Sequence, residues 1–76
     1  MNKKRRKEVW GVREKLQGCY NSLDSIKWEE DTARENMPES LEESEKYQLS
    51  EEWSDALETA CDSISEAIEV LGVMEN

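Results

Sequence analysis

The sequence predicts an all-α protein in which two long helices, about residues 4–36 and 50–74, fold back on each other as an antiparallel hairpin. Two observations support this prediction. Apolar residues recur at alternating steps of three and four in two separate stretches, which is the spacing of helices packed side by side. A single connector, about residues 37–50 and containing the one proline, joins the two stretches. Such a short connector favours antiparallel packing.

The first helix is predicted from a row of seam positions with one polar exception, Glu30. A lone polar residue in such a seam either sets the register of the helices or lies near a helix end, where water reaches it. We favour the second interpretation because the connector is only a turn or two away. The predicted seam positions are Val9, Val12, Leu16, Cys19, Leu23, Ile26, Glu30, Ala33 and Met37.

The connector begins at Met37, because the residue before a proline is disfavoured in helical geometry and Pro38 cannot donate to the preceding turn. Ser40 and Glu43 have the spacing of a capping box, which predicts a short helical turn inside the connector. Ser50 is the expected N-cap of the second helix.

The second helix carries a seam of its own and further apolar residues beside it. Its predicted seam positions are Trp53, Leu57, Ala60, Ile64, Ala67, Leu71 and Met74. The flanking apolar residues are Ala56, Cys61, Ile68 and Val70. This stripe is wider than one neighbouring helix covers. We therefore expect two hairpins to form a homodimeric four-helix bundle, with a different protein that completes the bundle as the alternative.

The chain of 76 residues is predicted to hold one domain, residues 9–76, preceded by a basic tail over residues 1–8. Its net charge of −9 is unevenly divided. Residues 1–38 hold nine Lys/Arg and seven Asp/Glu, a net of +2, whereas residues 39–76 hold one Lys and twelve Asp/Glu, a net of −11. The acidic half disfavours nucleic acid as a ligand. It suits either a basic protein partner or simple solubility.

Neither a secretory signal nor a membrane-spanning stretch is evident, and two cysteines are few for a disulfide framework. These features predict a cytoplasmic protein that does not contact a membrane. The chain has no histidine, no phosphate-binding glycine loop and too few Cys and His for a zinc site. We therefore expect no enzymatic activity, no catalytic residues, no metal and no cofactor.

Two sets of residues are candidates for partner binding. Trp10, Gly11, Gly18 and Trp28 lie off the predicted seam of the first helix, where they suggest a shallow groove bounded by aromatic side chains. Alternatively, the tryptophans shield the edges of the hairpin. The second set is the acidic face of the second helix, which comprises Glu51, Glu52, Asp55, Glu58, Asp62, Glu66 and Glu69. Its simplest interpretation is a solvated helix face.

The connector also carries a resemblance. The runs Asn36-Met37-Pro38-Glu39-Ser40-Leu41 and Ser44-Glu45-Lys46-Tyr47 precede an acidic amphipathic helix. In this respect residues 30–74 resemble small uncharacterised helical-hairpin proteins from phages and prophages of gut Firmicutes. The resemblance implies an origin in a mobile element and a bacterial cytoplasm as the site of action. It transfers no functional residue.

Three functional hypotheses follow in order of preference. The first is a phage accessory protein that binds a host protein stoichiometrically, for instance as an inhibitor of host defence of the anti-CRISPR kind. The second is a structural protein that only assembles with itself. The third is a sponge for a small ligand such as a cyclic nucleotide, which the negative charge disfavours.

Overall fold

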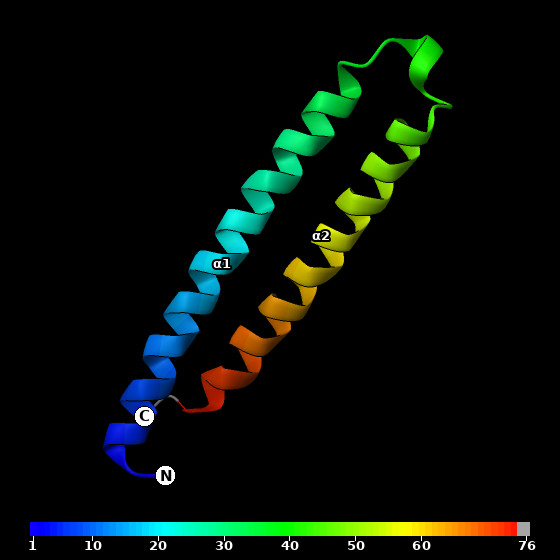
Figure 1. Cartoon of the computed structure of the whole chain (residues 1–76). Helices are drawn as coiled ribbons and strands as arrows, with labels where there is room; N and C mark the ends of the chain where they lie inside the picture. The colour runs from blue at the N-terminus through cyan, green and yellow to red at the C-terminus, as the bar shows by residue number, and fades with distance from the viewer. Residues whose placement is uncertain (75–76) are drawn as a thin grey trace.

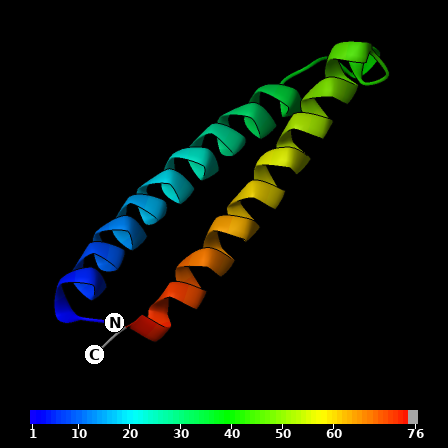
Figure 2. The same cartoon turned by 60° about the horizontal axis from the view of Figure 1, so that its bottom comes forward.

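Two long helices lie side by side and run in opposite directions (Figure 1), as the sequence predicts. The computed structural model describes residues 1–74. Helix α1 spans Lys3–Glu35 and helix α2 spans Glu45–Leu71. The short 3₁₀ turns η1, Glu39–Leu41, and η2, Gly72–Met74, lie in the connector and after α2. The Cα trace measures 59 × 14 × 13 Å, so the hairpin is a rod, and the N-terminus and the end of α2 lie at the same end of it (Figure 2).

The basic N-terminal run forms the first turns of α1. Asn2 caps the helix, because its Oδ1 accepts a hydrogen bond of 2.8 Å from the backbone N–H of Arg5. The cationic side chains of this segment are thereby fixed along a helix at the terminal end of the rod. At its other end α1 stops at Glu35, close to the predicted boundary.

Helix α2 begins earlier than predicted. Its N-cap is Ser44, whose Oγ accepts a hydrogen bond from the backbone N–H of Tyr47 at 3.2 Å. The predicted N-cap, Ser50, lies inside the helix and is only 3% exposed. The prediction was wrong because the polar residues before Trp53 do not end the helix: Ser50 faces α1 and accepts a hydrogen bond from Arg34.

The seam between the helices is also rotated from the predicted one. We define the seam as two rows of buried or half-buried residues spaced alternately by three and four. On α1 and just beyond it these are Arg6, Val9, Arg13, Leu16, Tyr20, Leu23, Lys27, Glu30, Arg34 and Met37. On α2 they are Tyr47, Ser50, Ser54, Leu57, Cys61, Ile64, Ile68 and Leu71.

Half of the predicted seam is therefore correct. Each helix contributes one predicted row, represented by Leu16 and Leu23 on α1 and by Leu57 and Ile64 on α2. The other predicted row of α1 is exposed and that of α2 is at most half-buried, with Trp53 56% exposed. The misplaced residues are Val12, Cys19, Ile26, Ala33, Trp53, Ala60 and Ala67. Met74, the last predicted position of the same row, lies in η2 beyond the end of α2.

Long amphipathic side chains of α1 occupy the second row of the observed seam. The row that replaces Val12 and Ile26 includes Arg13, Tyr20 and Lys27, whose stems or ring can cover apolar surface while their polar ends reach the rim. Arg13 donates from Nε to the backbone carbonyl of Ile68 at 2.9 Å, which ties α1 directly to α2.

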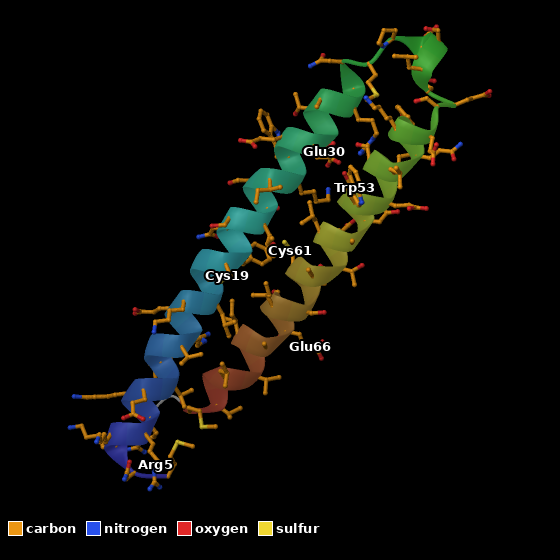
Figure 3. The ribbon with its side chains drawn as sticks, viewed as in Figure 1. Arg5, Cys19, Glu30, Trp53, Cys61 and Glu66 are labelled. Atoms are coloured by element: carbon orange, nitrogen blue, oxygen red, sulfur yellow. The ribbon has the colours of Figure 1, made fainter. Side chains whose placement is uncertain are left out.

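Near the connector the seam is polar. Arg34 donates from Nη1 to the Oγ of Ser54 at 2.9 Å and to both the Oγ and the backbone oxygen of Ser50 at 3.1 and 3.2 Å. The Ser50 hydroxyl in turn donates to Glu30 at 3.0 Å. Glu30 thus lies near the connector, as predicted, but it is half-buried and its carboxylate accepts a hydrogen bond from α2, so water is not its only partner (Figure 3). Among residues 1–74 the one buried apolar side chain is Cys61, so the hairpin has almost no hydrophobic core of its own.

Candidate interaction surfaces

The acidic face of α2 is exposed along its whole length, as predicted. All seven of its carboxylates are exposed, and their spacing places them on adjacent rows of the helix away from the seam. Figure 3 shows Glu66 on the side of α2 that points away from α1. The two ion pairs within residues 1–74 both involve Asp31, so the acidic face has no cationic partner there.

The predicted tryptophan–glycine face is not one continuous site. Trp10 is half-buried, and the guanidinium of Arg13 stacks over its ring at 4.5 Å from the centroid. Trp28 is 68% exposed and lies 18 residues further along α1, about 27 Å away along the helix axis. Between them, a Cβ added at Gly11 or Gly18 would meet nothing within 4 Å. Nothing within the hairpin therefore requires these two glycines.

A second surface, which sequence reasoning placed inside the hairpin, is open. We call it the open apolar face. In an antiparallel helix pair, the rows next to the seam on corresponding sides of the two helices lie along the same edge. The misplaced rows of α1 and α2 consequently form one apolar strip. It consists of Val12, Cys19, Ile26, Ala33, Trp53, Ala60 and Ala67, with Leu49, Ala56 and Val70 beside them on α2.

Exposed side chains lie along the open apolar face, and two shallow hollows adjoin it at the terminal end of the rod. Val12 and Ile26 are each 51% exposed, and Val70 is 60% exposed. One hollow of about 360 Å³ includes Val12 and Leu71 in its lining, and another of about 400 Å³ includes Val70 and Leu71. Projecting apolar side chains beside hollows are the surface features of helices that interlock with further helices.

A polar cluster lies on the opposite edge of the seam. Asp31 accepts hydrogen bonds from Lys27 Nζ and from Arg34 Nη2, each at 2.9 Å. The bond from Lys27, together with hydrogen bonding from Ser54 and Arg34, holds the pKa of Asp31 well below its usual range. The same bond to Asp31 raises the pKa of Lys27. The cluster connects α1 to α2 near the connector, which suits a structural role.

The two cysteines have different surroundings. Cys61 is buried in the seam, with its Sγ 3.9 Å from the backbone oxygen of Tyr20. Burial raises the pKa of the Cys61 thiol, and the nearby charges of Asp24 and Asp62 raise it further. Cys19 lies on the open apolar face, and both thiols are free. Cys61 was expected beside the seam and is instead part of it.

Within residues 1–74, no three Cys, Asp or Glu side chains come together in a way that could hold a metal ion. None of the helices described in that range combines the length and apolar character needed to cross a membrane. No family model, no curated protein and no solved structure matches the chain. The functional argument therefore rests on the surfaces described above.

Proposed function

We propose that the chain is a non-enzymatic protein-binding protein that works as a homodimer, with two hairpins packed through their open apolar faces as a four-helix bundle. The open apolar face is the observation that carries this proposal. The chain has 6016 Å² of accessible surface, whereas a compact monomer of its 8.9 kDa mass would have about 4,800 Å². The excess of about 1,200 Å² is more than the area of about 800 Å² that each partner contributes to an interface of ordinary size, so one such interface accounts for most of it.

The weak core of the single hairpin supports the same proposal. A chain of this size folds stably only with an unusually good core, a staple or a partner. Cys61 is its one buried apolar side chain among residues 1–74, and neither cysteine is in a disulfide. A second copy supplies the missing apolar contacts without any other molecule.

The acidic face is the surface that the dimer would present to other proteins. It lies on the rows of α2 that face neither α1 nor the open apolar face, so dimerisation leaves it exposed. Its exposed carboxylates, without cationic partners in residues 1–74, suit a protein with a basic surface. Together with the connector's resemblance to phage proteins, this favours an accessory protein that binds a host protein stoichiometrically, and inhibition of host defence is one specific form of that role.

Two measurements test this proposal. Light scattering on the purified chain should give about twice 8.9 kDa, and a monomer at micromolar concentration would overturn the dimer. Affinity purification from a bacterial host should then compare the native chain with a variant carrying Asp55→Asn, Asp62→Asn and Glu66→Gln. A control variant carrying Glu8→Gln, Glu14→Gln and Glu35→Gln loses the same charge from α1. A basic protein captured by the native and control chains, but lost with the first variant, would support the acidic face. Equal capture by all three would contradict it.

A further inference from the structure

The rod is electrically polar along its length. At the terminal end, residues 1–13 and 66–74 hold six Lys/Arg and three Asp/Glu, a net of +3. At the connector end, residues 29–52 hold two Lys/Arg and ten Asp/Glu, a net of −8. The antiparallel hairpin separates these two groups to opposite ends of a shape 59 Å long (Figure 1). That separation exceeds the screening length of about 8 Å at physiological ionic strength, so each end acts independently on a neighbouring molecule.

We propose that the two copies pack head to tail, with the basic terminal end of each hairpin beside the acidic connector end of the other. This inference rests on the dimer of the proposed function and adds its orientation. Two arrangements place one open apolar face against another along the length of the rod. In the parallel arrangement, the two connector ends, each at −8, would lie together. In the head-to-tail arrangement, a terminal end with a net charge of +3 lies beside a connector end with a net charge of −8 at both ends of the bundle.

The charged groups of two packed hairpins are close enough for the charge difference between the two arrangements to matter. Packed helices lie about 8–10 Å apart, which is comparable to the screening length, so charges at the same level of neighbouring hairpins still interact. Like charges placed together at an interface disfavour that arrangement, whereas opposite charges select it. Charge therefore separates two arrangements that the apolar contacts alone would not.

The open apolar face extends along a large part of the rod and fits a second copy of the same shape. On α1 it runs from Val12 to Ala33, about 32 Å by the helical rise, on one side of a rod whose Cα trace is 59 Å long. The dimer uses the full length of the face only if the two rods overlap along it, which both arrangements allow, so the charges at the two ends decide between them. Exposed apolar side chains occur near both ends of the face, at Val12 and Trp53, so complete overlap covers both.

Arg5 supplies a specific contact for this arrangement. It continues the α1 row of Val12, Cys19, Ile26 and Ala33 by one further step of seven, and it lies at the terminal end of the rod (Figure 3). In a head-to-tail dimer centred near the middle of α1, Arg5 lies at the level of Ala33 of the other copy. Glu29 precedes Ala33 by one helical turn, so its carboxylate is within reach of the guanidinium.

The orientation also decides where the acidic faces lie. A two-fold axis across the rods places α1 against α1 of the other copy and α2 against α2. The two α2 helices then lie next to each other on one side of the bundle, and their acidic faces lie at neighbouring edges. In the parallel arrangement α2 would lie against α1 of the other copy, and the acidic faces would lie at diagonally opposite edges.

Pulsed electron spin resonance on two single-label variants of the full chain distinguishes the arrangements. Both variants carry Cys19→Ala, which removes the thiol and keeps the open apolar face apolar, and the buried Cys61 stays in place. The test site is Glu35→Cys at the connector end, and the control site is Asn21→Cys near the middle of α1. Both residues are exposed, lie on the same row 14 residues apart and are off the open apolar face. Light scattering on each labelled protein reports whether it is a dimer.

For the head-to-tail dimer we expect the Asn21 labels roughly 25 Å apart, about the width of two stacked helices, and the Glu35 labels beyond about 45 Å. Equal short distances at both sites in a dimer would overturn the orientation and leave the dimer standing. A monomeric mass with no dipolar signal at either site would overturn the dimer itself, and the orientation with it.

Discussion

Truncating Ile26 should dissociate the dimer while leaving the hairpin folded. Ile26 lies on the open apolar face and is 51% exposed in the hairpin, so about half of its side chain is still available for burial. Full burial of an isoleucine is worth about 1.5–3 kcal/mol, and the remaining half therefore contributes about 1 kcal/mol per copy. A symmetric dimer contains the residue twice, so Ile26→Ala should cost about 2 kcal/mol, which raises the dissociation constant about 30-fold.

Sedimentation equilibrium measures this dissociation constant, and circular dichroism at high protein concentration reports whether the helices persist. Trp28→Ala is the matched control, because it removes a larger and more exposed apolar side chain, 68% exposed, from another side of α1. We expect its dissociation constant to stay within about twofold of the native value. An Ile26→Ala dimer as tight as the native one, or a dimer that Trp28→Ala weakens more, would show that the wrong face has been assigned.

Four further predictions concern stability and charge. Gly18→Ala should stabilise the protein by about 0.5–1 kcal/mol in thermal unfolding, because alanine favours the helix and its Cβ meets nothing within 4 Å; a lower melting temperature would reveal an undetected close contact. Arg34→Met should lower the free energy of unfolding in urea by about 2 kcal/mol, because the hydroxyl of Ser54 loses its charged donor. Lys46→Met, at an exposed site, should change this free energy little. Equal effects of the two substitutions would show that the bonds of Arg34 do not stabilise the hairpin. The lowered pKa of Asp31 means that its contribution to stability is fully present well above pH 3.8, the ordinary pKa of the group, and is lost as the pH falls through the folded-state pKa. Asp31→Asn should therefore make unfolding depend less on pH below about pH 5. An unchanged pH dependence in that range would contradict this. Arg5→Glu should weaken the dimer a few-fold and added Glu29→Lys should restore it, as judged by sedimentation; failure of the second change to rescue the first would exclude that pair.

The fold was predictable because the chain offers few alternatives. Alternating steps of three and four suit helices and not strands, and Pro38 interrupts them once. The rotation of the seam was not predictable from this pattern. Apolar periodicity selects the row of Val12 and Ile26 over that of Arg13 and Lys27, because it scores a long cationic side chain as polar throughout.

The polar contacts between the helices depend on how the two helices pair in three dimensions. The fit of Arg34 against Ser50 and Ser54 requires the register of the two helices, which no spacing within one helix reveals. The acidic face, in contrast, was correctly predicted as exposed, because it depends on the rows of a single helix. The sequence signal for the polar cluster was present as small serines on α2 opposite a long cation on α1, but only the paired structure shows which residues meet.

The difference between the predicted and observed seams itself supports the dimer. In a four-helix bundle each helix contacts two neighbours, so its apolar stripe must be wider than one seam. In the hairpin, the row of Leu16 and Leu23 is the seam row that borders the open apolar face. In the proposed dimer this row faces the centre of the bundle, and the row of Val12 and Ile26 packs against the second copy. The apolar pattern in the sequence then describes the core of the whole bundle, whereas the polar row of Arg13 and Arg34 belongs to the contact within one hairpin.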